Sequence, residues 1–148
     1  MRDHLMATLQ ELGLAPQRVA DGVAVQLPSE RRGSFVVLIT PTERALAMRA
    51  FIMRHPDRAH QDVYWRLLTK NLTATDWRWA LDSDGDVFLT AYVPHSFAEA
   101  DRLDGLLGGA CAAVDQVFEG IARTGFDIPE GQSLRPPPPD PSDELGAQ

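Results

Sequence analysis

Three aspartates close together in the chain, Asp82, Asp84 and Asp86, have the side-chain type and spacing best suited to binding a cation. A calcium loop of the EF-hand type needs glycine at its sixth position and glutamate at its twelfth. Counted from Asp82, Gly85 is the fourth residue and Val93 the twelfth, so the spacing excludes this calcium site. An Asp-Gly pair between two apolar runs is instead typical of a tight turn in a β-hairpin.

Histidine and cysteine complete neither a metal site nor an activated nucleophile. His55 and His60 are five residues apart across an expected helix start, which is the wrong spacing for two ligands on one helical turn. Cys111 is the only cysteine, so a disulfide within the chain is impossible. No neighbouring cation would lower the pKa of its thiol. We expect a buried, inert thiol and surface or capping roles for the histidines.

A serine nucleophile and a phosphate-binding loop also lack support. Ser96 has His95 and Asp101 nearby in the sequence, but a catalytic triad is a spatial arrangement. Ser96 and Glu99 instead match the S-x-x-E pattern of a capped helix start. The glycine-rich segment 105–109 follows a helical pattern and lacks the lysine and the Ser/Thr of a phosphate loop. We therefore expect no enzyme activity, no metal and no cofactor.

Aromatic side chains are the strongest candidates for recognition of a partner, because they offer a large contact area at low rotamer cost. A two-residue turn at Asp84-Gly85 would pair Trp79 with Thr90. That register places four aromatic side chains on one face of the hairpin: Trp77, Trp79, Phe88 and Tyr92. This face is predicted to bind a client, with ordinary core packing as the alternative.

Three glycines interrupt the apolar pattern of the last helix, where each costs about 1 kcal/mol relative to alanine. Gly105 and Gly109 are four residues apart and so lie on one helical face. Their missing side chains predict close packing on the sheet or on a second subunit. A frayed or kinked helix is the alternative.

Hydrophobic periodicity predicts helix, three strands, helix, two strands and helix. The expected helices span 2–14, 56–72 and 96–122, and the expected strands span 23–27, 35–40, 45–53, 77–81 and 88–92. In the second helix, five apolar residues form a stripe expected to be buried: Val63, Tyr64, Leu67, Leu68 and Leu72. The fold class is therefore α+β, a two-layer sandwich with a five-stranded antiparallel sheet packed by helices.

The segment 35–40 is apolar at every position but the last, which is typical of a strand buried on both faces. Three helices on one side cannot cover such a sheet completely. Homodimerisation or client binding would bury the remainder.

Length and composition predict one domain at residues 1–126 and an acidic, proline-rich tail at 127–148 that is disordered or polyproline-like. The chain has 148 residues, 44% of them hydrophobic, and a net charge of −7. The tail holds five acidic residues against one arginine, a net −4 that leaves −3 on the rest. Such a body has no basic stripe for phosphates, so we expect no nucleic-acid partner.

The expected compartment is the cytoplasm. The N-terminal residues lack a basic segment followed by an apolar run, and there is no pair of cysteines. The longest apolar helical stretch is interrupted by Asp104, Asp115 and Glu119, which excludes an ordinary membrane span.

The hairpin segment 79–89, followed by Val93-Pro94 and a long final helix, resembles the bacterial YbjN family over residues 1 to about 123. The resemblance implies a fold like that of type III secretion chaperones, which are small α+β sandwiches, usually homodimers, that grip extended segments of a client protein. It supplies no catalytic residues. The glycine-rich last helix and the proline-rich tail depart from the family pattern.

Together these observations predict a non-enzymatic, homodimeric, chaperone-like or adaptor protein that binds a client protein or extended peptide. The alternative is a small-molecule-binding sensor or enzyme with a pocket between the sheet and the last helix.

Overall fold

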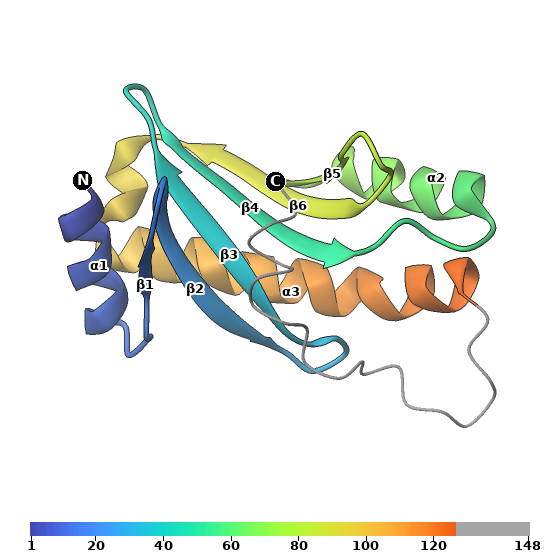
Figure 1. The fold of residues 1–148 in the computed structure, drawn as a ribbon, viewed down its shortest axis with the longest axis horizontal. Helices are drawn as coiled ribbons and strands as arrows, with labels where there is room; N and C mark the ends of the chain where they lie inside the picture. Colours follow the sequence, from blue (N-terminus) through green and yellow to red (C-terminus); the bar gives the residue numbers. More distant parts are fainter. Residues whose placement is uncertain (127–148) are drawn as a thin grey trace.

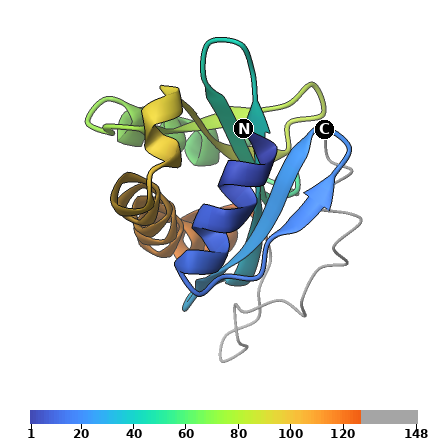
Figure 2. The ribbon, with the colours of Figure 1, turned by 90° about the vertical axis from the view of Figure 1, so that its left-hand side faces the viewer.

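Six antiparallel strands form one sheet in the computed structural model, with spatial order β1-β2-β3-β4-β6-β5. The structure describes residues 1–126, and the predicted tail at 127–148 lies outside the described residues. Helices α1 and α3 lie on one side of the sheet, and α2 lies beside strand β5 (Figures 1 and 2). The elements are α1 Arg2–Glu11, β1 Gln17–Val19, β2 Gly22–Ser29, β3 Gly33–Pro41, β4 Leu46–Met53, α2 His60–Asn71, β5 Trp77–Leu81, β6 Val87–Val93, the 3₁₀ turn η1 His95–Ala98, and α3 Ala100–Gly125.

The α+β fold class and the antiparallel sheet are confirmed. The predicted number of strands, five, is one fewer than the six observed. The additional strand β1 is three residues long and pairs antiparallel with the start of β2, with Val19 opposite Gly22. A three-residue strand carries no measurable apolar alternation, so periodicity could not find it.

Apolar side chains that point toward α1 and α3 make one continuous core. They come from alternate positions of the strands, as expected for a pleated sheet: Val23, Val25, Leu27, Phe35, Val37, Ile39, Met48, Ala50, Ile52, Val87, Leu89, Ala91 and Val93. Leu5 and Leu9 of α1, and Leu103, Ala110, Val114 and Ile121 of α3, pack against them without measurable exposure. Each buried leucine or isoleucine contributes about 1.5–3 kcal/mol.

The opposite face of the sheet, called the outer face below, carries the other alternate residues: Val36, Leu38, Thr40, Ala47, Arg49, Phe51, Arg78, Ala80, Phe88, Thr90 and Tyr92. Within residues 1–126, no helix packs on this face (Figure 2). Strand β3 carries Val36 and Leu38 on the outer face and Val37 and Ile39 on the core face. This strand is therefore apolar on both faces, as expected.

The predicted register of the β5–β6 hairpin was wrong by one residue, because Trp79 pairs with Leu89 rather than with Thr90. The turn has three residues between Asp82 and Asp86, whose backbone N–H and C=O bond at 3.1 Å. Gly85 has the left-handed φ of +83° that such a loop requires. Asp82 Oδ1 accepts the N–H groups of Asp84 and Asp86 at 2.9 Å each. A one-residue change of register moves side chains to opposite faces.

Helix α2 buries only part of its predicted stripe. Val63 and Leu67 are buried against the core, whereas Leu68 and Leu72 point to the surface. The last helix begins later than predicted: Ser96 lies in η1, and Glu99 is the N-cap residue of α3 without a side-chain cap bond. Ser96 Oγ instead accepts a hydrogen bond from Arg102 at 2.8 Å.

No helix in residues 1–126 is both long enough and apolar enough to cross a membrane.

Candidate functional site

The four aromatic side chains predicted to form one surface lie on two faces of the sheet. Trp77 and Trp79 point toward α3, and each is only 6% exposed. Tyr92 lies on the outer face and is 65% exposed. Phe88 shares that outer face but is buried, with its ring edge-to-face against Phe51 at 5.7 Å between centroids. Of the four, only Tyr92 is free to contact a partner through most of its ring.

Trp77 connects the edge strand β5 to α3 through a hydrogen bond. Its indole Nε1 donates a hydrogen bond to the backbone oxygen of Leu106 at 2.8 Å. A Cβ built on Gly109 would lie 3.6 Å from Trp77 Cδ1, an ordinary van der Waals distance. Trp77, Trp79, Gly105 and Gly109 together line a groove of about 370 Å³ between β5 and α3.

The glycines of α3 do not bring the helix backbone onto the sheet. Gly105, Gly108 and Gly109 are all exposed, and a Cβ on Gly105 or Gly108 would meet nothing within 4 Å. The three glycines therefore leave a shallow surface on α3, open to a second molecule.

Gly108→Ala is expected to raise the free energy of unfolding by about 1 kcal/mol, because it removes backbone freedom in a helix interior without any clash. Gly22→Ala is the matched control, and it is expected to lower the free energy of unfolding. A Cβ on Gly22 would lie 2.0 Å from the backbone oxygen of Ile39. Urea unfolding followed by circular dichroism measures both. A loss of stability in Gly108→Ala would contradict the open surface.

Helix α2 presents a row of large apolar side chains to solvent, called the α2 row. Trp65 and Leu68 are each 67% exposed and Leu72 is 85% exposed. Spacings of three and four residues place them on one helical face. Beside this row, a groove of about 290 Å³ between α2 and α3 includes Trp65 and Gly120 in its lining. Exposed apolar rows of this kind mark sites of protein association.

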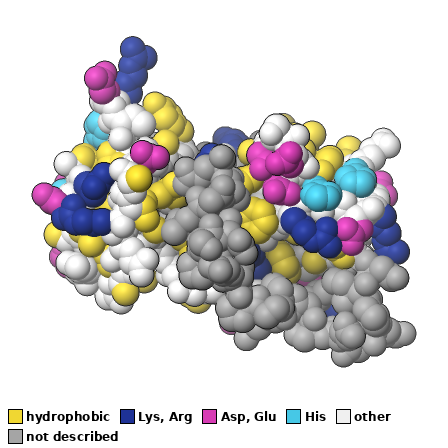
Figure 3. Space-filling model, viewed as in Figure 1, with side chains coloured by type: hydrophobic (Ala, Val, Ile, Leu, Met, Phe, Trp, Pro, Cys, Tyr) yellow, Lys and Arg dark blue, Asp and Glu magenta, His cyan; other side chains and the backbone are white. Residues whose placement is uncertain are grey.

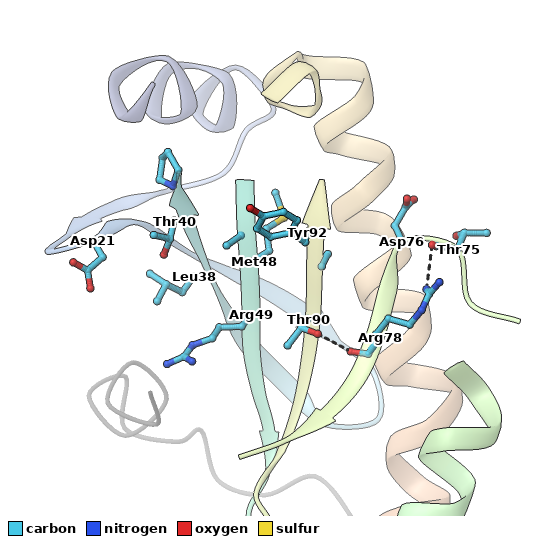
Figure 4. Close-up of a pocket in the computed structure, with 13 residues that line it drawn as sticks. Asp21, Leu38, Thr40, Met48, Arg49, Thr75, Asp76, Arg78, Thr90 and Tyr92 are labelled. Carbon is cyan, nitrogen blue, oxygen red and sulfur yellow. Dashed lines mark hydrogen bonds between the residues drawn. The ribbon is translucent and has the colours of Figure 1, made fainter. Parts of the chain in front are cut away.

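The outer face is hollowed into an open basin of about 930 Å³ that spans strands β3, β4, β6 and β5 (Figure 4). Thr40, Arg49, Thr90 and Tyr92 rise from its floor and rim. On this side of the molecule, hydrophobic side chains lie among charged ones (Figure 3). The basin thus combines an aromatic ring, hydroxyl groups and guanidinium groups on a sheet surface.

Two arginines, Arg49 and Arg78, line the basin together with two carboxylates, Asp21 and Asp76. Arg49 lies over the Phe88 ring at 5.6 Å from the centroid, a cation–π arrangement. Arg78 Nη1 donates to the backbone oxygens of Thr75 at 3.1 Å and Trp77 at 3.0 Å. Within residues 1–126, neither arginine has a carboxylate within ion-pair distance. Both retain donors for an anionic partner.

The free edge of the sheet at β5 is closed by a side chain. Asn71 Oδ1 accepts the backbone N–H of Trp79 at 2.7 Å, and Asn71 Nδ2 donates to the Trp79 carbonyl at 2.9 Å. The amide of Asn71 therefore takes the place that a further strand would occupy. This arrangement opposes the pairing of a client strand along this edge.

The remaining reactive side chains have structural partners. His55 Nδ1 lies 3.4 Å from Asp86 Oδ1, and the His60 ring centroid lies 6.0 Å from that of Tyr64. Burial, and then the negative charge of Asp115, raise the pKa of the Cys111 thiol, which disfavours the reactive thiolate. In residues 1–126 no group of three His, Cys, Asp or Glu side chains could hold a metal ion.

The sequence matches a family model, YbjN, over residues 1–123, and that model is described as "Putative bacterial sensory transduction regulator". The chain belongs to the YbjN family. Two relatives are "Uncharacterized protein Rv0487" of Mycobacterium tuberculosis, 31% identical over 111 residues, and "Uncharacterized protein ML2442" of Mycobacterium leprae, 32% identical over 111 residues. These matches cover 75% and 73% of this YbjN chain. The chain spans only 61% and 60% of the length of those relatives.

Two solved structures share the fold of this YbjN protein. One is the Yersinia pestis type III secretion chaperone SycH in complex with a stable fragment of YscM2, with a TM-score of 0.56, 19% identity and coverage of 78% of this chain and 98% of that one. The other is the heterodimeric ExoU–SpcU complex of the Pseudomonas aeruginosa type III secretion system, with a TM-score of 0.50, 19% identity and coverage of 80% and 92%. At this identity the likeness shows the fold alone, and it confirms the fold implied by the resemblance.

Sequence reasoning missed the α2 row and the two basin arginines. The sequence predicts burial for Leu68 and Leu72 because they continue the apolar stripe of Val63 and Leu67. Trp65 is not part of that predicted stripe. Arg49 and Arg78 interrupt apolar strands, and that interruption is the signal that could have marked an open sheet face in this YbjN chain.

Proposed function

We propose that this YbjN protein is a non-enzymatic, homodimeric, chaperone-like or adaptor protein of the cytoplasm that holds an extended segment of a client protein. The observation that carries the proposal is the open basin of the outer face, where Tyr92 is exposed on a sheet without a covering helix in residues 1–126. Apolar contact with Tyr92 and hydrogen bonds to Arg49, Arg78 and Thr90 would hold such a segment.

The shared fold adds support from proteins that have partners. SycH is described in complex with a fragment of YscM2, and SpcU in complex with ExoU. Each of those structures is thus described as a complex with another protein.

The homodimer would form through the α2 row and the adjacent surface of α3. A twofold interface brings the same patch of both subunits together, so large side chains must meet small ones. Trp65, Leu68 and Leu72 supply the large side chains. Gly105 and Gly109 of α3, which line the groove between β5 and α3, leave room for them.

Two substitutions separate the two surfaces. Leu68→Glu is expected to weaken the dimer about 100-fold by placing a charge in an apolar interface, a cost of about 2.7 kcal/mol. It leaves the basin unchanged. Tyr92→Asp is the matched control, because Tyr92 is equally exposed but lies on the outer face. Sedimentation measures the dimer, and an unchanged dimer in Leu68→Glu would contradict the α2 interface.

Client binding is tested in the native cell with a photo-crosslinking amino acid placed at position 92. A defined set of partner proteins should be captured there, and not from the same group placed at Arg102 on α3. The charge reversal Arg49→Glu should reduce that capture. Capture of the same proteins from both positions, or of none from position 92, would overturn the proposal.

A small-molecule sensor is the second candidate, because the groove between β5 and α3 is lined by Trp77 and Trp79 beside Asp76 and Lys70. A ligand present at 100 times its dissociation constant should add about 2.7 kcal/mol of stability. A thermal-shift screen against metabolites therefore distinguishes this function from client binding.

A further inference from the structure

Two guanidinium groups of the outer-face basin come from one row of residues across the strands. Arg49 of β4 pairs with Thr90 of β6, and Thr90 pairs with Arg78 of β5. The two arginines are therefore attached on either side of Thr90 (Figure 4). The Arg49 guanidinium lies over the Phe88 ring, toward the start of β6 and away from Tyr92. This row of the basin is thus cationic.

The carboxylates of the basin lie one row further along the strands. Tyr92 marks that row, about 7 Å further along β6 at strand spacing. Asp76 directly precedes Trp77, whose partner is Ala91, so Asp76 lies beside Tyr92. Asp21, in the turn before β2, lines the opposite side of the basin (Figure 4). The basin is therefore divided by sign along the direction of its strands.

None of the four charges has an ion-pair partner in residues 1–126. Neither carboxylate has an Arg, Lys or His nitrogen within ion-pair distance in this part of the chain. Asp76 and Arg78 are two residues apart, yet Arg78 Nη1 donates to the backbone oxygens of Thr75 and Trp77 instead. Three of the four charged side chains are exposed, and Arg49 is half-buried. Both signs of charge therefore remain available to a partner.

An extended segment lying along β6 would place alternate side chains on these two rows. Alternate side chains of an extended chain point the same way and are about 7 Å apart, which matches the spacing of the rows. An acidic side chain on the first row would bind Arg49 and Arg78. A basic side chain two residues away would meet the carboxylate of Asp76 and the exposed ring of Tyr92, a cation–π surface.

We propose that the segment held in the basin carries an acidic and a basic side chain two residues apart. The acidic one binds Arg49 and Arg78, and the basic one lies beside Asp76 and Tyr92. This rests on the proposed function, since the segment is the client's, and it adds the charge pattern that selects the client. A segment with the same charge at both positions would meet one row of like charge, which opposes binding.

Synthetic peptides and the purified full chain test this pattern. The mixed peptide is acetyl-STVETRVTS-amide, with glutamate and arginine two residues apart. Acetyl-STVTERVTS-amide is the control of identical composition, in which the two charges are adjacent and so point to opposite faces of an extended chain. Fluorescence anisotropy should show at least about tenfold tighter binding of the mixed peptide, because only there do both charge-assisted contacts form together.

Charge reversal in the basin should change which peptide is preferred. Arg49→Glu with Arg78→Glu makes both rows acidic, so the two-arginine peptide acetyl-STVRTRVTS-amide should become the tightest ligand. Asp21→Arg with Asp76→Arg makes both rows basic, so acetyl-STVETEVTS-amide, with two glutamates, should become the tightest.

A matched control reverses the same charge elsewhere. Arg102→Glu with Arg123→Glu changes two exposed residues of α3 and should retain the preference for the mixed peptide. Circular dichroism checks that each variant is folded. Because Arg49 is half-buried, the single changes Arg78→Glu and Asp76→Arg at exposed positions repeat the test if the double variant does not fold.

Equal affinity for the mixed and adjacent-charge peptides would overturn the proposal, as would a preference that the basin reversals leave unchanged. Failure of every peptide to bind would also overturn it. If proteins are captured by crosslinking at position 92 but the peptides show no charge preference, the proposed function stands and the charge pattern fails. If the mixed peptide is preferred and no protein is captured there, only the proposed function fails.

Discussion

A chain carrying Trp79→Asp is expected to be unfolded, whereas one carrying Tyr92→Asp is expected to keep the wild-type fold. Trp79 is 6% exposed within the core. Truncating a buried tryptophan costs about 3–5 kcal/mol, and burying an unpaired carboxylate adds several more. That sum approaches the whole stability of a typical domain, about 5–15 kcal/mol. Tyr92 is 65% exposed, so its replacement removes little buried area.

Far-ultraviolet circular dichroism and the amide spectrum of each purified variant measure the difference. Trp79→Phe is the milder companion variant, since it keeps an aromatic ring in the core, and its expected cost is about 1–2 kcal/mol. A folded Trp79→Asp chain with lost client capture would instead place Trp79 at a binding surface. That result would contradict both the register and the burial described above.

The sequence predicted the core of the fold because its elements are strongly periodic. The strands at Phe35 and Ala50 alternate or run apolar over many residues, and the stripe of α3 from Leu103 to Ile121 repeats at helical spacing. These long patterns leave a single arrangement that buries them. The short strand β1 and the later start of α3 depend on a few local hydrogen bonds, which periodicity does not record.

The candidate site was predicted less well because it depends on register. Counting from a two-residue turn placed all four aromatic side chains on one face, but the three-residue turn puts Trp79 on the core side and Phe88 on the outer face. Gly85 was correctly read as a turn residue. The side chain of Asp82 accepts two backbone N–H groups of the turn and so sets its length. The Asp-Gly pair alone does not reveal the length of the turn.

Helix α2 shows a similar limit. Val63 and Leu67 form one apolar row, and Leu68 and Leu72 form the adjacent one. A helix carrying two adjacent apolar rows can bury either row, and its packing against β5 and α3 decides which. The exposed row is then free for a partner. An apolar stripe wider than one buried face is therefore itself evidence for an interface.

Asn71→Ala is expected to lower the free energy of unfolding by about 3 kcal/mol, because it removes two hydrogen bonds and leaves the Trp79 N–H and C=O unpaired at the strand edge. Urea unfolding measures this loss. Lys70→Ala is the control on the neighbouring exposed position, and its change should stay within about 0.5 kcal/mol.

The same variant tests how the sheet edge is protected. With Asn71 in place, the Trp79 amide should exchange slowly with solvent although β5 is an edge strand. In Asn71→Ala it should exchange much faster, and the open edge should associate with other chains, which light scattering detects. Slow exchange in the variant would mean that another group closes the edge. Fast exchange without association would mean that Asn71 serves stability alone. Association would show that this side chain keeps the edge closed, so that clients are limited to the outer face.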